Sequence, residues 1–218
     1  MRFKAAWAGA LLAGAVVATP AQAQINYFTQ GFFSSGNPAC NQPVTPNPIL
    51  GPLGASCVFP GGFTLAFAPK ALNPGLIGSG SVVSLGSFAL TGSGNITVPA
   101  GPILFTLAIQ QTDPTTGTGT TLGSISGTVR TVPNDFSTLI WTPAPSRVVI
   151  GNTTYDLIFD NRGPAKDVGY AIGVNNAANP TSIQAVVATP EPASMTLLAT
   201  GLVGIFGAAR RRRKNVAA

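Results

Sequence analysis

The sequence predicts an all-β protein whose body, residues 24–188, is a single β-sandwich domain with jelly-roll or immunoglobulin-like connections. Roughly ten short segments alternate apolar with polar residues, and turns rich in Gly, Pro, Asn or Thr separate them. No amphipathic helix is evident in the body. Two sheets with apolar inner faces satisfy this pattern, and a closed barrel satisfies it equally well.

Residues 1–23 have the three parts of a secretory signal peptide. Arg2 and Lys4 supply a positive n-region, residues 5–18 form an apolar stretch, and Ala21-Gln22-Ala23 is a small-x-small cleavage site. We expect cleavage after Ala23, which makes Gln24 the first residue of the mature chain. A non-cleaved anchor helix is the alternative, but the apolar stretch is short for a membrane span.

Alternation of apolar residues and turn signals locate the strands of the body. The predicted strands are residues 25–33, 63–68, 82–90, 95–98, 102–111, 122–131, 147–150, 153–159, 168–174 and 182–188. The strongest is 102–111, where alternate apolar side chains share one face. Residues 112–121 predict a polar hairpin loop after this strand, and Gly151-Asn152 predicts a second hairpin.

Cys40 and Cys57 enclose a proline-rich segment. An exported protein reaches an oxidising compartment, where an even number of cysteines favours pairing. A bridge here would stabilise the fold by about 3 kcal/mol in the chain-entropy model. We therefore expect a structural disulfide. A reactive thiol pair is the alternative, although no basic or histidine neighbour is evident to lower a thiol pKa.

Residues 189–214 consist of a proline-bounded motif, an apolar segment and a basic tail. Pro190 and Pro192 flank Glu191, and because proline lacks a backbone donor, no helix or central strand is expected to cross the motif. Residues 193–209 carry no charge and would form a helix about 25 Å long, near the lower limit for a bilayer span. The tail, which should stay cytoplasmic, is Arg210, Arg211, Arg212, Arg213 and Lys214.

A buried C-terminal helix with a solvated basic tail would also explain the apolar segment. The proline-bounded motif before it and the basic block after it favour membrane insertion instead. In this order of parts, residues 189–214 resemble the PEP-CTERM sorting signal, in which Pro-Glu-Pro-Ala precedes a transmembrane segment and an Arg-rich end. Thr189 departs from that pattern, since Val is commonest at this position.

The resemblance implies that an exosortase, an integral-membrane cysteine protease, recognises Pro190, Glu191 and Pro192 and cuts at or near them. It also implies a Gram-negative bacterium that makes exopolysaccharide. The chain would pass through the secretion machinery and be anchored transiently in the inner membrane. Its destination would then be the cell surface or the extracellular matrix.

The formal net charge of +6 is confined to the two ends of the chain. Arg2, Lys4 and the basic tail, offset by Glu191, account for all of it, because the Lys and Arg residues of the body are balanced by its Asp residues. A neutral body lacks the basic surface that nucleic-acid binding requires. We therefore expect no nucleic-acid partner.

The sequence contains no histidine, which excludes Ser-His-Asp and Cys-His catalysis and His-ligated zinc. We expect no cofactor, no metal site and no catalytic residue. A calcium site made by Asp156, Asp160, Asn161 and Asp167 is conceivable, but no EF-hand spacing supports it. Solvated acids paired with nearby basic residues are the simpler interpretation.

The favoured function is therefore that of a non-enzymatic surface or matrix protein associated with exopolysaccharide or biofilm. The alternative is a carbohydrate-binding module or a weak glycan-acting enzyme at the cell surface. Aromatic rings that stack on sugars would be needed for that alternative. Trp141, expected at a loop edge beside Thr142-Pro143-Ala144-Pro145, is the candidate glycan contact.

Overall fold

The protein is described here from a computed structural model. The structure describes residues 24–35, 40, 46–47, 51–59, 62–72, 75–77, 79–93, 95–130, 138–159, 165–173, 178–189, 201–202 and 205. The chain divides into two units, of which the β body, Ala23–Pro190, is one. In the other unit the structure describes only Gly201, Leu202 and Ile205, which are helical. The predicted signal peptide, the Pro190–Pro192 motif and the basic tail lie outside the described residues.

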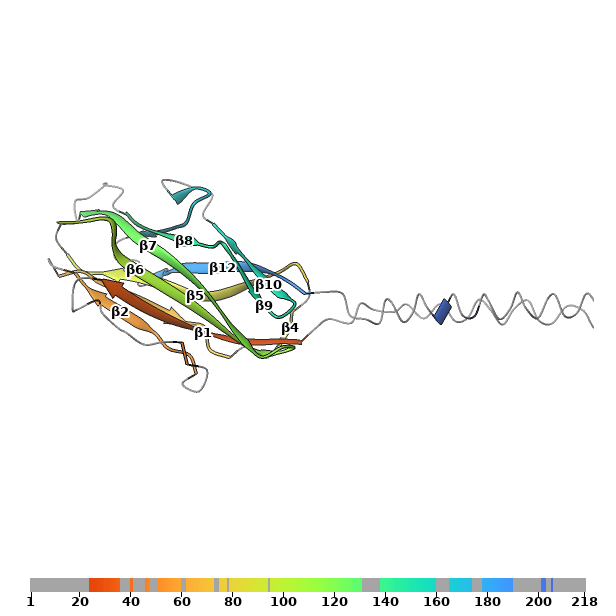
Figure 1. Cartoon of the computed structure of the whole chain (residues 1–218). Coiled ribbons are helices and arrows are strands. Elements are labelled where there is room, and N and C mark those ends of the chain that lie inside the picture. The colour runs from red at the N-terminus through yellow and green to blue at the C-terminus, as the bar shows by residue number, and fades with distance from the viewer. Residues whose placement is uncertain are drawn as a thin grey trace, which may run out of the picture. The chain divides into compact units, whose positions relative to one another are not determined.

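The body consists of two six-stranded antiparallel sheets that pack face to face (Figure 1). The first contains, in spatial order, β11 (Tyr170–Gly173), β8 (Thr138–Ala144), β7 (Gly117–Arg130), β6 (Asn95–Asp113), β1 (Gln24–Ser35) and β4 (Gly75–Leu76). The second contains β2 (Ala55–Val58), β3 (Thr64–Pro69), β5 (Ser81–Thr91), β12 (Thr181–Ala188), β10 (Thr153–Ile158) and β9 (Arg147–Ile150). The all-β prediction is confirmed, and two layers are consistent with a β-sandwich; the jelly-roll or immunoglobulin-like connection stays a prediction.

Alternation along the strands directs apolar side chains into the space between the sheets. In β10 the pattern of buried and half-buried residues repeats every second position, which places Tyr155 and Leu157 inside. β6 contributes Ile103, Phe105 and Leu107 to the same layer. The two sheets approach closely between β7 and β9, where a Cβ at Gly119 would collide with Val148 and Ile150.

One half of the core is aromatic. Phe105 contacts Phe33, Phe67 and Phe88 with ring centroids 4.8–5.0 Å apart. Trp141 packs edge-on against Phe105 at 5.3 Å and stacks on Tyr170 at 5.6 Å. These rings, contributed by both sheets, are here called the aromatic half: Phe33, Phe67, Phe88, Phe105, Trp141 and Tyr170. Dense ring packing of this kind excludes water and joins the two layers.

The Cys40–Cys57 segment is attached to β1 and β2. The structure joins Cys40 to Cys57 by a disulfide, and Cys57 lies in β2 opposite Leu65 of β3. Gln30 of β1 is fully buried and donates from Nε2 to the carbonyl oxygens of Asn47 (2.7 Å) and Gly51 (2.6 Å). Its Oε1 accepts from the backbone N–H of Asn47 (2.9 Å). One buried amide thus satisfies backbone groups that the proline-rich segment cannot pair within itself.

The body begins and ends at the same end of the sandwich. Gln24, the first residue of β1, pairs with Leu76 of β4, and Ser81, the first residue of β5, pairs with Val187 of β12. Only a few residues connect Leu76 with Ser81, so the start of β1 and the end of β12 are close neighbours (Figure 1). We call this the terminal end.

Three sequence predictions about the strands were wrong. The hairpin predicted after strand 102–111 is present, but its loop spans only residues 114–116 and not 112–121, because β6 continues to Asp113 and β7 begins at Gly117. The strands predicted at 95–98 and 102–111 are one strand, interrupted by a register shift between Val98 and Ile103. β8, which contains Trp141, was expected to be a loop edge because its Pro143 resembles a turn residue. Pro143 is accommodated where β8 pairs with Gly123 of β7.

Candidate functional site

Trp141, the predicted glycan contact, lies in the core. Its side chain is fully buried at the centre of β8, where it is in register with Ile125 of β7 and Tyr170 of β11. A Cβ at Gly123 would collide with Trp141 Nε1, so this glycine creates the space for the indole. A ring enclosed in this way cannot stack on a sugar at the surface, and the prediction is wrong. Tyr155 and Tyr170 are buried as well.

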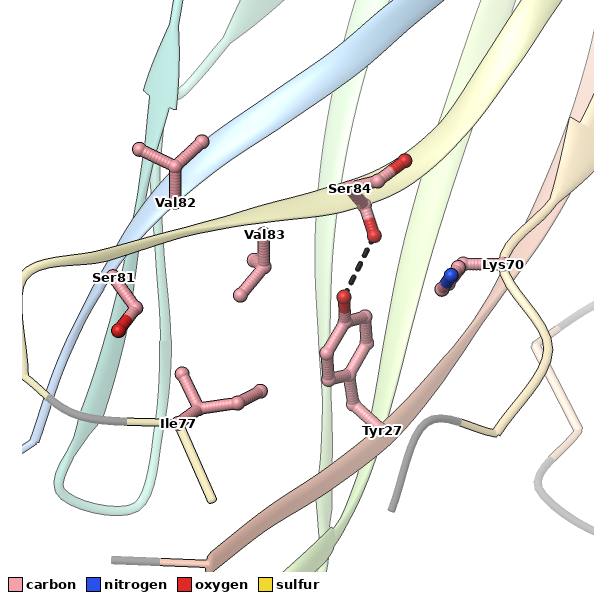
Figure 2. A pocket seen from close by; sticks show the side chains of 7 residues that line it. All are labelled: Tyr27, Lys70, Ile77, Ser81, Val82, Val83 and Ser84. Atoms are coloured by element: carbon pink, nitrogen blue, oxygen red, sulfur yellow. Dashed lines mark hydrogen bonds between the residues drawn. The ribbon is translucent and has the colours of Figure 1, made fainter. Parts of the chain in front are cut away.

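A surface pocket of about 280 Å³ lies between β1 and β5, near the terminal end. It is lined by Tyr27, Lys70, Ile77, Ser81, Val82, Val83 and Ser84. Figure 2 shows two sides of different character: Tyr27, Ser84 and Lys70 gather on one side, and Ile77 with Val83 on the other. Sequence reasoning missed this pocket, since its residues come from three separate segments. The available signal was Lys70, a rare cation of the body beside the apolar strand 63–68.

Tyr27 forms the floor of the pocket and connects it to the core. Its ring is fully buried and its hydroxyl donates to the carbonyl oxygen of Ser84 at 2.7 Å (Figure 2). Burial raises the pKa of Tyr27 to about 12, because the phenolate would lose its hydration there. The phenol is therefore neutral at physiological pH and acts as a hydrogen-bond donor.

A second buried tyrosine continues this polar layer away from the pocket. Tyr155 lies edge-on to Tyr27 with ring centroids 5.9 Å apart, and its hydroxyl donates to Gln111 Oε1 at 2.8 Å. Gln111 Nε2 in turn donates to the carbonyl oxygen of Thr115 at 2.9 Å. Burial raises the pKa of Tyr155 as well. We call Tyr27, Ser84, Gln111 and Tyr155 the tyrosine half of the core.

Lys70 is the charged group of the pocket, and its backbone is fixed to β1. The N–H of Lys70 donates to Thr29 Oγ1 at 2.7 Å, and its carbonyl oxygen accepts from the N–H of Thr29 at 3.0 Å. Thr29 is itself fully buried. The ammonium group forms no ion pair with any carboxylate that the structure describes. A positioned cation thus stands at the rim of a pocket whose other lining is neutral.

Among the carboxylates of the predicted calcium alternative, Asp156 is occupied by an ion pair. Both of its oxygens accept from the guanidinium group of Arg147 across the β9–β10 hairpin. This contact raises the pKa of Arg147. Asp160 and Asn161 lie outside the described residues. Within the part of the chain that the structure describes, no three metal-binding side chains cluster.

The C-terminal signal follows directly on the last strand. Ala188, the final residue of β12, pairs with Thr154 of β10, and Thr189 alone stands between it and Pro190. The family model described as the PEP-CTERM protein-sorting motif matches residues 188–213. The chain carries a PEP-CTERM sorting motif. No curated protein and no solved structure matches the chain.

The PEP-CTERM motif implies an exported, surface-targeted protein that an exosortase processes. Its matched span includes the three predicted recognition residues Pro190, Glu191 and Pro192 and most of the basic tail. The predicted membrane segment 193–209 lies almost wholly outside the described residues. No helix within the described ranges is long and apolar enough to cross a membrane.

Proposed function

We propose that this chain is a non-enzymatic protein of the cell surface or extracellular matrix that an exosortase sorts and that associates with exopolysaccharide or biofilm. The PEP-CTERM motif at residues 188–213 carries the proposal, because it begins at the last residue of β12. Processing at Pro190–Pro192 would therefore release the β body with almost nothing attached. The body is then the part of the protein that remains to act.

Export proceeds in this proposal by insertion of both ends of the chain. Residues 1–23 direct secretion and are removed after Ala23. Residues 193–209 hold the C-terminus in the inner membrane, with the basic tail on the cytoplasmic side. The body supports this order, because the start of β1 and the end of β12 lie at the same end of the sandwich. Both segments can then enter one membrane without the chain passing around the body.

A non-catalytic role is supported by how the polar groups of the body are engaged. Tyr27 and Tyr155 are buried and hydrogen-bonded, and burial raises the pKa of each above that of an ordinary tyrosine, so neither supplies a phenolate at neutral pH. Asp156 is neutralised by Arg147. The sequence contains no histidine that could act as a general base. These groups contribute to packing and surface charge balance, and none has the arrangement of a nucleophile beside a base.

Replacement of Glu191 tests the sorting step. We expect Glu191→Ala to leave residues 193–214 attached when the chain is expressed in an exosortase-bearing host, as measured by intact mass. Thr189→Val, which changes the neighbouring residue to the one commonest in the motif, is the matched control and should be processed normally. Normal processing of Glu191→Ala would contradict recognition through Pro190–Pro192.

Sedimentation with the host's own exopolysaccharide tests the role of the body. We expect the exported protein to sediment with the polymer and to generate no new reducing ends during prolonged incubation. Failure to sediment would contradict the association with exopolysaccharide. Release of reducing ends would instead favour the glycan-acting enzyme.

A further inference from the structure

The pocket between β1 and β5 combines three chemical features. The fold brings them together, because no single segment of the chain supplies all three. Lys70 supplies a positive charge at the rim, Ser81 supplies a hydroxyl, and Ile77 with Val83 supply an apolar wall (Figure 2). Tyr27 closes the floor, since its hydroxyl is already bonded to Ser84. A ligand would therefore meet Lys70, Ser81 and the apolar wall, and not the phenol.

The position of Lys70 is set by its backbone and not by its side chain. Both hydrogen bonds to Thr29 use backbone groups of Lys70. Because these bonds do not engage the side chain, the ammonium group is available to a ligand. The same bonds hold the backbone of Lys70 beside the pocket. In a body whose basic and acidic residues balance, an ammonium that pairs with no described carboxylate attracts an anion.

The chemistry of the pocket selects among anions. One ammonium group matches the single charge of a carboxylate, whereas a phosphate site usually adds further donors or backbone N–H groups to its lysine. The apolar wall suits the C–H face of a ring, and the Ser81 hydroxyl can bond to a ring hydroxyl. A volume of about 280 Å³ lies just below the range of about 300–1,000 Å³ for ligand pockets, which suits one ring and not a chain.

We propose that this pocket binds a single carboxylate-bearing sugar, a hexuronate unit of an acidic polysaccharide, with its carboxylate on Lys70 and one ring face on Ile77 and Val83. The proposal rests on the association with exopolysaccharide proposed above and names the part of the polymer that is recognised. It places recognition on β5 and on the residues that directly follow β3 and β4, away from the buried indole of Trp141.

Titration of the exported protein with sodium glucuronate tests this site, with glucose and hexanoate as probes of the ring and of the carboxylate alone. We expect saturable glucuronate binding, seen as chemical-shift changes near Ser81, and weaker binding of both other probes. Lys70→Met should weaken glucuronate binding at least about tenfold, as loss of a charge-assisted hydrogen bond predicts. Because Met keeps both backbone bonds to Thr29, the fold should be retained.

Lys166→Met is the matched control, since Lys166 is exposed and does not line the pocket. It should bind glucuronate as the unaltered protein does. Equal binding by Lys70→Met, absence of glucuronate binding, or hexanoate binding as tight as that of glucuronate would each overturn the proposal. Sedimentation with exopolysaccharide, measured in parallel, separates the two proposals. If the protein sediments with the polymer but does not bind glucuronate, only the proposal about the pocket is overturned.

Discussion

The two halves of the core are built by the same alternation of residues but differ in their polarity. In the aromatic half, Phe105 and Trp141 are surrounded by rings, and Trp141 Nε1 has no hydrogen-bond partner in the described structure. In the tyrosine half, each phenol is bonded to a specific acceptor, Ser84 or Gln111. The pocket and both ends of the body lie on the tyrosine side. The difference indicates that one half provides cohesion and the other provides a polar border to the surface.

Replacing Trp141, the central ring of the aromatic half, should show the difference between the two halves most clearly. Trp141→Ala removes contacts with Phe88, Phe105 and Tyr170, so we expect the free energy of unfolding to fall by about 3–5 kcal/mol. Urea unfolding measures this. If the variant is folded at low temperature, its glucuronate binding should be unchanged. A loss below about 1 kcal/mol would contradict a central role for this ring.

Removal of the disulfide should have the next largest effect. Cys40 and Cys57 are 17 residues apart, so the double change to Ser should lower the free energy of unfolding by about 3 kcal/mol. The bridge lies on the side of the aromatic half, because Cys57 faces Leu65, two residues from Phe67. Thermal unfolding of the double variant beside the oxidised parent measures this loss. An unchanged midpoint would show that Gln30 alone holds the segment.

The tyrosine half should be more tolerant of change. Tyr155→Phe keeps the ring but leaves Gln111 Oε1, in a buried side chain, without its donor, which should cost about 1–3 kcal/mol. Tyr170→Phe is the comparison, since its hydroxyl also donates to an acceptor, the carbonyl oxygen of Gln184. Chemical denaturation of both variants gives the two costs. A cost for Tyr155→Phe as large as that of Trp141→Ala would remove the distinction between the halves.

Alkaline pH should weaken the fold through the tyrosines. The pKa of Tyr27 rises from its ordinary 10.0 to about 12 on folding, so the folded state holds its proton more tightly than the unfolded state. Stability is thus fully present below pH 10 and falls as pH rises from 10 through about 12. Unfolding followed by circular dichroism over this range measures the slope, which should be shallower in Tyr27→Phe. An identical slope in that variant would contradict the assignment.

The strands were predictable where alternation is regular, and less so where a residue has an unusual neighbour. The β9–β10 hairpin was predicted from Gly151-Asn152, and its pairing of Thr153 with Ile150 confirms it. β8 was missed because proline is typical of a turn and Pro143 lies within this strand. Gly123 of β7 stands opposite Pro143 and allows β7 and β8 to pair. β4 was missed because it is only two residues long, and β2 was missed although it is as long as β9.

The candidate sites divide in the same way. The sorting motif was predictable because Pro190, Glu191, Pro192 and the segments after them are contiguous in the sequence, and the family model confirms it. The pocket was not, because Tyr27, Lys70 and Ser81 become neighbours only when β1 and β5 approach each other. Trp141 was assigned to a loop edge because the Thr142-Pro143-Ala144-Pro145 stretch beside it resembles a turn, whereas its burial depends on β8 pairing with β7 and β11.

Intact mass of the protein recovered from the surface fraction of its host tests the central claim most directly. The account predicts a chain that starts at Gln24 and ends between Thr189 and Pro192, so that the β body is the mature protein. A mass that still includes Arg210–Lys214 would contradict it. The chain would then be a permanently tethered envelope protein, and the PEP-CTERM motif would not direct its release.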